Sequence, residues 1–218
     1  MKSLIHLFFG ALVMLALSQC QSGAKDVKFE IETPYGTMQG ILYKETPLHQ
    51  ANFIKLAKAG YYDGLLFHRV MPGFMIQGGD PESRTAQPGQ PLGMGGPDYK
   101  IDAEIGKFHY KGALAAARQA DQVNPAKQSS GSQFYIVEGQ KFEEPFLDQM
   151  EQQKGIKYDQ EARQKYMELG GYPPLDNDYT VFGLVTEGLN VIDSIANVPR
   201  DQADRPLQNV PMKVRILN

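Results

Sequence analysis

The densest group of side chains that could do chemistry lies between residues 67 and 80, around a Pro-Gly turn. It combines Arg69 and the amide of Gln77 with two large apolar side chains, Phe74 and Met75. Alternate residues of a strand share a face, so Arg69 can meet Gln77 once the turn has reversed the chain. A guanidinium carries a permanent charge and donates hydrogen bonds from a rigid fork. It can therefore act on a polar bond held against apolar groups. The alternative is a hairpin whose arginine is a solvated surface charge.

Metal or redox chemistry is not expected from this sequence. His68 is interpreted as structural, because no second histidine lies at ligand spacing and both His49 and His109 are distant. A single cysteine excludes an intramolecular disulfide framework and a CxxC site. We therefore expect neither a metal nor a cofactor.

Short strands and many turns must position these side chains. Apolar runs, several of them alternating with polar residues, predict strands at 27–32, 37–43, 65–70, 74–77, 113–117, 134–137, 180–185 and 210–217. Thr46-Pro47 predicts the start of a helix that Gly60 ends, and a second helix begins near Glu187 or Gly188. Glycine and proline make 78–99 a loop. This pattern predicts a mainly β fold, closed or nearly closed into a barrel.

Residues 140–172 interrupt the strand pattern with a helical composition rich in Glu, Gln and Lys. Pro145 can start one helix that Gly155 ends, and a second is predicted from Asp159 to Leu169. The segment is too small to own a hydrophobic core. It is interpreted as an inserted helical hairpin.

The N-terminal residues 1–19 have the pattern of a signal peptide. The apolar run from Leu4 to Leu17 is too short to cross a hydrocarbon core of about 30 Å as a permanent helix. Cys20 follows this run closely, an arrangement that resembles the bacterial lipoprotein signal, in which the cysteine is lipidated. The alternative is an ordinary signal peptide with an incidental Cys20. Residues 20–26 are then a lipid-anchor tether and 27–218 the folded domain.

The charge balance limits the possible partners of the protein. The chain has 218 residues and a formal net charge of −3, without a visible cluster of Lys and Arg. Nucleic-acid binding needs such a cluster to neutralise phosphates. We therefore expect no nucleic-acid partner.

Three motifs resemble those of the cyclophilins, which are peptidyl-prolyl cis-trans isomerases. Residues 67–80 read FHRVMPGFMIQGGD and are similar to the signature of that family. Residues 131–136 (GSQFYI) are similar to a second family motif, and Leu175-Asp176 with 179–183 (YTVFG) to a third. The resemblance implies a closed eight-stranded antiparallel barrel, capped by two helices and carrying 140–172 as an insert.

The resemblance also implies roles for individual residues. Arg69 is the implied catalytic arginine, and the implied substrate-binding residues are Phe74, Met75, Gln77, Ala117, Arg118, Gln133, Tyr135, Leu175 and Tyr179. The apolar members of this set would line a proline pocket, while Gln77 would orient Arg69. Gln133 and the backbone near Ala117 and Arg118 would hold the peptide. Pro174 stands where cyclosporin-sensitive members have Trp, so weak inhibition by that drug is expected.

The expected reaction is rotation about an X–Pro bond. Its partial double-bond character gives a barrier of roughly 18–20 kcal/mol, and no bond has to break. We expect an isomerase that assists the folding of exported proteins, acting on proline-containing peptides and unfolded chains. It would be a monomer, lipid-anchored in a bacterial cell envelope. The alternatives are a proline-peptide binding module or chaperone with incidental turnover, and a structural lipoprotein with a vestigial cleft.

The insert leaves the barrel after the strand that carries Tyr135 and returns just before Leu175. Both of its ends therefore flank the expected proline pocket. It either only packs against the barrel, or forms one wall of an extended groove that selects substrates beyond the proline.

Overall fold

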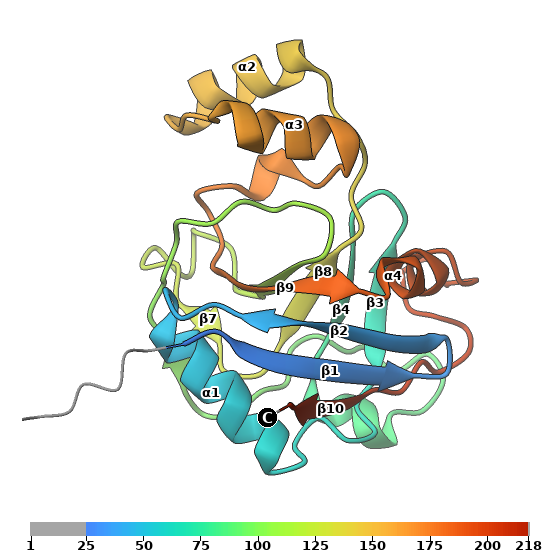
Figure 1. Ribbon diagram of the computed structural model, residues 1–218. Helices are drawn as coiled ribbons and strands as arrows, with labels where there is room; N and C mark the ends of the chain where they lie inside the picture. The colour runs from blue at the N-terminus through green and yellow to red at the C-terminus, as the bar shows by residue number, and fades with distance from the viewer. Residues whose placement is uncertain (1–24, 218) are drawn as a thin grey trace, which may run out of the picture.

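The computed structural model describes residues 25–217, and its main body is one curled antiparallel sheet (Figure 1). The predicted signal peptide, 1–19, and the lipidation site, Cys20, lie outside the described residues. The eight strands of the sheet have the order β10-β1-β2-β9-β6-β8-β4-β3. The prediction of a mainly β fold with eight antiparallel strands is thus confirmed.

The elements fall close to the positions predicted from the sequence. The strands of the large sheet are β1 (Val27–Thr33), β2 (Gly36–Leu42), β3 (Phe67–Met71), β4 (Met75–Gly78), β6 (Ala113–Ala116), β8 (Phe134–Val137), β9 (Val181–Glu187) and β10 (Lys213–Ile216). A separate pair is formed by β5 (Lys100–Ile101) and β7 (Ser129–Ser130). The α-helices are α1 (Pro47–Lys58), α2 (Glu144–Lys154), α3 (Gln160–Glu168) and α4 (Leu189–Ala196). Two short 3-10 helices are η1 (Pro81–Thr85) and η2 (Pro173–Leu175).

The interior of the curled sheet holds the main hydrophobic core. In β1, Phe29 and Ile31 are buried there, while the alternating charged residues Lys28, Glu30 and Glu32 are more exposed. Gly40 of β2 is needed for this packing, since a Cβ there would lie 2.2 Å from the Leu184 carbonyl oxygen and 2.8 Å from the Phe29 ring. Helices α1 and α4, the two predicted capping helices, add their buried faces to the same core.

The outer face of the sheet carries a second, smaller apolar cluster. Along β8, Phe134 and Ile136 belong to the interior core, whereas Tyr135 and Val137 belong to the outer cluster. The two-residue period of a strand thus divides β8 between two apolar environments. The outer environment is where the candidate site lies.

The prediction of a closed barrel is wrong. Strands β3 and β10 are the two edges of the sheet and form no ladder with each other. The gap between them is bridged by the segment before β10, through an isolated antiparallel bridge between Leu66 and Pro211 and a few backbone hydrogen bonds. The bridge is flanked by hydrogen bonds from the Phe67 N–H to the Val210 carbonyl and from the Met212 N–H to the Leu65 carbonyl, but it stays isolated and is not extended into a ladder between β3 and β10. The result is a curled half-barrel.

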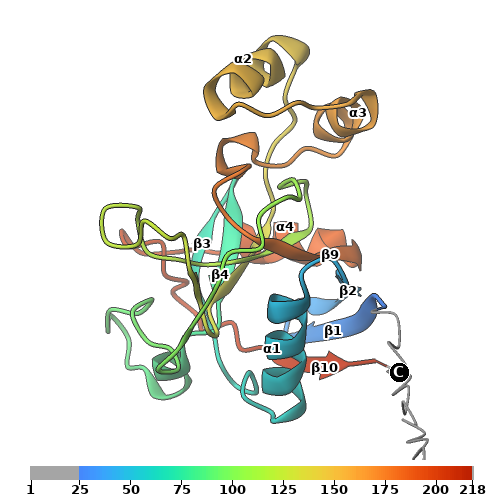
Figure 2. The ribbon, with the colours of Figure 1, turned by 90° about the vertical axis from the view of Figure 1, so that its left-hand side faces the viewer.

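The inserted hairpin of α2 and α3 stands away from the body of the sheet in both ribbon views (Figures 1 and 2). Its predicted helices are present, and Gly155 ends α2 in the left-handed region at φ 64°. It does have a small hydrophobic cluster, which includes Leu147 and Tyr166. That cluster is completed by Phe108 and Tyr110 from the segment before β6, so it is shared with the barrel.

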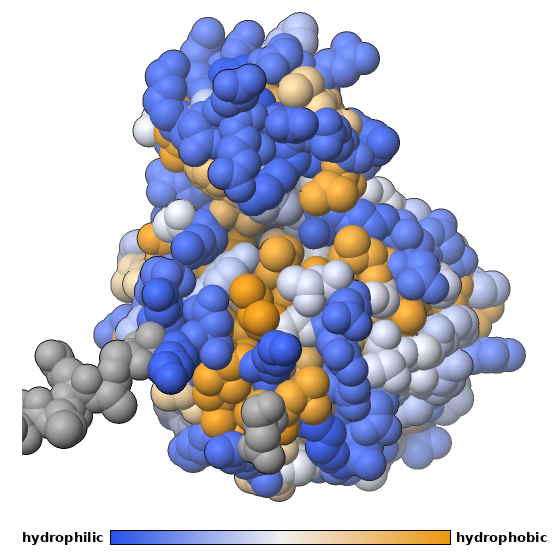
Figure 3. Space-filling model, viewed as in Figure 1, coloured by the Kyte–Doolittle hydropathy of each residue, from blue (hydrophilic) through white to orange (hydrophobic). Residues whose placement is uncertain are grey.

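The surface of the hairpin is mainly hydrophilic on the face shown in Figure 3. Most of its apolar side chains are instead gathered in the cluster shared with Phe108 and Tyr110, whereas Leu169 stays half exposed. Among residues 25–217, no helix has both the length and the apolar character needed to cross a membrane.

Candidate active site

A row of facing side chains crosses three neighbouring strands on the outer face of the sheet. Arg69 on β3 is paired with Gln77 on β4, and Gln77 is paired with Tyr135 on β8. Directly opposed residues of an antiparallel pair point to the same face. The structure therefore brings the arginine, the amide and the aromatic ring together, as strand alternation predicted for the first two.

A chain of hydrogen bonds fixes the polar part of this row. Arg69 donates from Nη1 to Gln77 Oε1 at 3.4 Å, and Gln77 donates from Nε2 to Gln133 Oε1 at 3.1 Å. Gln133 in turn donates to the Gly95 carbonyl at 2.7 Å. Within residues 25–217, Arg69 makes one further side-chain hydrogen bond, from Nη2 to the Met71 sulfur at 3.0 Å. The half-buried guanidinium therefore keeps N–H donors for a ligand.

The apolar part of the site lies beside this row. Met75 and Tyr135 are buried in it, and Phe74, Leu175 and Tyr179 pack against them while staying partly exposed. The predicted pocket-lining residues are thus brought together, from the β3–β4 turn, two strands and the segment before β9. Such a cluster can hold an apolar ring next to the guanidinium of the same face.

A cavity of about 460 Å³ is lined by four of the predicted substrate-binding residues, but not by Arg69. It is lined by Gln77, Gln133, Ala117 and Arg118, and by the glycine-rich loop at 93–96. Apart from Ala117, the members of the apolar cluster do not line this cavity. Ala117 belongs to both, so the two parts adjoin there.

The glycine-rich loop is held against the cavity by a buried carboxylate. Asp80 accepts hydrogen bonds from the N–H groups of Gly93 at 2.5 Å and Gly95 at 3.3 Å. A Cβ at Gly95 would lie 2.3 Å from Asp80 Oδ1, so a larger residue does not fit. The amides of the loop are used internally, as expected of a structural turn.

Ala117 and Arg118 differ in what their backbones can offer to a peptide. Ala117 donates to the Gln133 carbonyl at 3.0 Å and accepts from the Ser130 N–H at 2.8 Å. The Arg118 backbone makes no hydrogen bond within residues 25–217. Its guanidinium lies 4.4 Å from the centre of the Tyr179 ring and donates to the Asp178 carbonyl. Arg118 is therefore the residue whose peptide groups are available.

His68 is the one buried side chain whose nitrogens find no partner among the described residues. It lines a second cavity, of about 360 Å³, together with Arg69 and Arg205. Burial lowers the pKa of His68 from 6.5 to about 4, although the nearby Asp80 charge opposes the change. The ring is consequently neutral near pH 7, and it fits the structural role predicted for it.

This burial makes the stability of the protein depend on pH. The unfolded chain protonates His68 near pH 6.5 and the folded chain only near pH 4. Between these values the unfolded state binds more protons, so the free energy of unfolding falls as the pH is lowered, by about 3 kcal/mol from this residue. The variant His68→Phe should lack that contribution. The free energy of unfolding can be measured by urea titration at several pH values from 7 to 4. If it fell equally with pH in both proteins, the lowered pKa of His68 would be contradicted.

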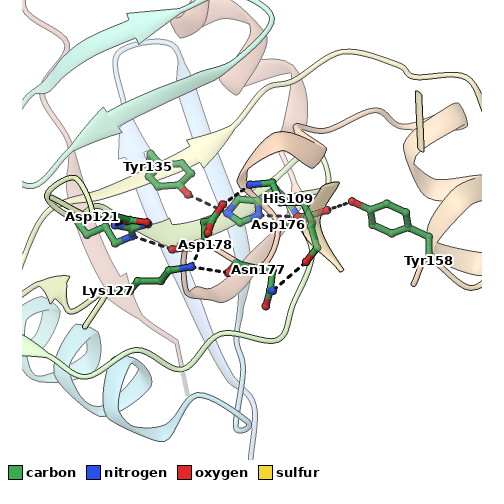
Figure 4. Close-up of polar contacts among 10 residues, drawn as sticks. His109, Asp121, Lys127, Tyr135, Tyr158, Asp176, Asn177 and Asp178 are labelled. Atoms are coloured by element: carbon green, nitrogen blue, oxygen red, sulfur yellow. Dashed lines mark hydrogen bonds and ion pairs between the residues drawn. The ribbon is translucent and has the colours of Figure 1, made fainter. Parts of the chain in front are cut away.

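A buried polar network behind the apolar cluster was not predicted from the sequence. The Tyr135 hydroxyl lies 2.9 Å from His109 Nε2, and His109 Nδ1 lies 2.8 Å from Asp176 Oδ1 (Figure 4). Asp176 belongs to a motif singled out in the sequence but has no predicted role, and His109 is mentioned there only as distant from His68. Tyr172 was also missed; its ring packs on Phe74 with 4.3 Å between centroids. His109 precedes β6, whereas Tyr172 and Asp176 flank η2, and no spacing signal links these two parts of the chain.

Comparisons with known proteins agree with this geometry. Residues 27–215 match the cyclophilin type peptidyl-prolyl cis-trans isomerase/CLD family. A Staphylococcus aureus protein described as a peptidyl-prolyl cis-trans isomerase is 34% identical over 186 residues, which cover 85% of this chain and 88% of that one. A Streptococcus pyogenes protein described as a bifunctional phosphatase/peptidyl-prolyl cis-trans isomerase is 38% identical over 186 residues, or 84% of this chain. This chain spans only 37% of that relative's length.

Solved structures show the same fold. A Cryptosporidium parvum cyclophilin type peptidyl-prolyl cis-trans isomerase superposes with a TM-score of 0.66 at 24% identity, covering 89% of this chain and 99% of that one. The same protein, crystallised in the presence of the dipeptide Ala-Pro, gives a TM-score of 0.61. Within residues 25–217 no group of three acidic, histidine or cysteine side chains is arranged to hold a metal. With the family match covering most of the sequence, this chain belongs to the cyclophilin-type peptidyl-prolyl cis-trans isomerases.

Proposed function

We propose that this chain accelerates cis-trans isomerisation of X–Pro bonds, with Arg69 as its catalytic residue. The observation that carries the proposal is the row of Arg69, Gln77 and Tyr135 on one face of the sheet, beside the apolar cluster. The family match and the names of the relatives support the same activity. The crystallisation of a structural neighbour with Ala-Pro supports proline-containing peptides as ligands.

The chemistry needs positioning and charge, without a nucleophile. The barrier to rotation comes from delocalisation of the nitrogen lone pair into the carbonyl. As the bond twists, the lone pair returns to nitrogen and can accept a hydrogen bond. A hydrogen bond from Arg69 to this nitrogen is therefore stronger in the twisted state than in either planar state. An interaction accelerates a reaction only if it is stronger in the transition state than in the ground state.

The remaining predicted residues divide between gripping the ring and holding the chain. Phe74, Met75, Tyr135, Leu175 and Tyr179 would contact the proline ring. The neighbouring cavity would take the peptide on the polar side, where Gln133 and the Arg118 backbone line it. Gln77 would orient the guanidinium through the hydrogen bond that the two side chains already share.

A coupled peptide assay tests the proposal. A protease that cleaves only the trans form of an Ala-Pro tetrapeptide reports the rate of isomerisation, which is slow without a catalyst. We expect the slow phase to accelerate in proportion to the protein concentration. A slow phase that is unchanged at any protein concentration would contradict the proposal.

We infer that the protein acts as a lipid-anchored monomer in a bacterial cell envelope, where it assists the folding of exported chains. The support is the sequence before residue 25, in which Cys20 follows an apolar run. Two or more acyl chains give stable anchoring, where a single chain gives only marginal binding. Mass spectrometry of the native N-terminal peptide should find an acylated Cys20. An unmodified Cys20, or cleavage at another residue, would contradict this inference.

A further inference from the structure

The inserted hairpin is connected to the outer apolar cluster by an unbroken chain of buried hydrogen bonds (Figure 4). Tyr158 and Tyr166 both donate to Asp176 Oδ2, at 2.7 and 2.6 Å. The Asp176 Oδ1 atom accepts from the His109 backbone N–H and from Nδ1, both at 2.8 Å. His109 Nε2 then accepts from the Tyr135 hydroxyl at 2.9 Å. One end of the chain is the hairpin and the other is a ring of the proposed proline pocket.

This network has a defined direction of donation. Asp176 accepts four hydrogen bonds without an arginine or lysine on it among the described residues. In the neutral imidazole only one ring nitrogen carries a proton, so donation from His109 Nδ1 to that carboxylate leaves Nε2 as an acceptor for the Tyr135 hydroxyl. Burial raises the pKa of Tyr158 and Tyr166 far above the usual tyrosine value, with the Asp176 charge adding to the effect. Both hydroxyls therefore keep the proton that they donate.

Burial makes the network rigid. Asp176 and His109 are 0% exposed, and the His109 and Tyr135 rings lie nearly parallel, 10° apart with 6.0 Å between centroids. A fully satisfied buried polar network fixes its members in one arrangement, because any other arrangement leaves a polar group unpaired. The Tyr135 ring is therefore held from behind by His109.

The two ends of the hairpin are also hydrogen-bonded to each other and to the backbone of His109. Gln140 and Gly171 exchange two backbone hydrogen bonds of 3.0 Å, and the Tyr172 N–H donates to the His109 carbonyl at 2.7 Å. A second tie joins Lys154, the last residue of α2, to Asp178. The pocket residues Leu175 and Tyr179 lie on either side of these anchored aspartates in the chain.

We propose that the hairpin sets the shape of the proline pocket through this chain of hydrogen bonds. Asp176 and His109 are then positioning residues, and Tyr135 transmits their position to the substrate. The inference rests on the proposed function, because it assigns a role at the same site. It differs from a groove wall that selects residues beyond the proline, since it acts on the proline ring itself and short peptides should report it.

The test compares two hairpin hydroxyls with a matched control. The double variant Tyr158→Phe with Tyr166→Phe removes two donors to Asp176 and keeps both rings. Tyr110→Phe is the control. The Tyr110 ring packs on the Tyr166 ring with 4.8 Å between centroids, but its hydroxyl makes no hydrogen bond to Asp176. With an Ala-Pro tetrapeptide, we expect KM to rise by about threefold to tenfold in the double variant with kcat nearly kept. Tyr110→Phe should leave KM as in the parent.

A second background separates this coupling from a loss of stability. In Tyr135→Phe protein the last link is missing, so adding the two hairpin changes should alter KM by less than about twofold. The inference would be overturned if the two hairpin changes raised KM by the same factor in the parent and in the Tyr135→Phe protein. It would also be overturned if they left KM unchanged in the parent. A lower stability that affected the fold as a whole would give the same factor in both.

NMR spectroscopy and binding measurements distinguish a failure of the proposed isomerase activity from a failure of the proposed role of the hairpin. In the parent, addition of the tetrapeptide should shift the ring nitrogen resonances of His109, and in the double variant this shift should shrink. If the parent binds the peptide without turnover, the proposed function fails, and the dissociation constant then takes the place of KM in the same comparison. His109 resonances that do not respond to bound peptide would overturn the inference alone.

Discussion

Replacing Arg69 with alanine is expected to lower kcat/KM for an Ala-Pro tetrapeptide by about 10²–10³-fold, or roughly 3–4 kcal/mol of transition-state stabilisation. The guanidinium is the one permanent charge in the row it shares with Gln77 and Tyr135. Its loss removes the donor for the twisted nitrogen and leaves the apolar cluster in place. Peptide binding should therefore weaken much less than turnover.

Two further variants give this prediction its controls. Arg69→Lys keeps the charge but loses the rigid fork, so it should recover only part of the activity. Arg84→Ala removes an exposed arginine that contacts the carbonyls of Tyr61 and Asp63, away from the cleft, and should leave kcat/KM unchanged. A folded Arg69→Ala protein with parental turnover would show that the catalytic residue is misassigned.

The variant Asp176→Ala is expected to lower the free energy of unfolding by about 3–5 kcal/mol. It leaves four buried donors without their acceptor: the backbone N–H and Nδ1 of His109 and the hydroxyls of Tyr158 and Tyr166. Each unsatisfied buried group costs about 1–3 kcal/mol, and entry of water into the space relieves part of the sum. Urea denaturation should show a lower midpoint with an unchanged m-value.

Asp178→Ala is the matched control for this measurement. Asp178 lies two residues further along, with a side chain 28% exposed, and pairs with Lys127 and Lys154. Partly exposed ion pairs contribute little, so the loss should be about 1 kcal/mol or less. A loss of that same size for Asp176→Ala would show that the buried network is not a source of stability.

Local patterns sufficed for the elements and for one part of the site. Strand alternation placed Arg69 and Gln77 on one face, and the structure pairs them directly. The ends of the hairpin helices were readable because their signals are local: Asp159 caps α3 by accepting from the Ala162 N–H, and Gly155 takes the left-handed conformation that ends α2.

Features that depend on distant pairing could not be predicted in this way. Closure of the sheet requires β3 to pair with β10, and no local pattern shows that the two strands are joined only by an isolated bridge in the segments next to them. His109 and Asp176 are 67 residues apart, and each alone has the appearance of an ordinary polar loop residue. Only the fold brings them together behind Tyr135. The assignments of the substrate-binding residues, of Arg69 as the catalyst and of Cys20 as a lipidation site stay predictions.

Exchange spectroscopy on an Ala-Pro tetrapeptide tests the central claim most directly, because it needs no protease and separates binding from turnover. Cis and trans forms give separate proton signals, and they interconvert too slowly alone to exchange magnetisation. With a small fraction of an equivalent of this protein, we predict exchange cross-peaks between the two forms, which disappear with Arg69→Ala. Peptide signals that shift on binding without any cis-trans cross-peak would identify a proline-binding module and contradict the isomerase.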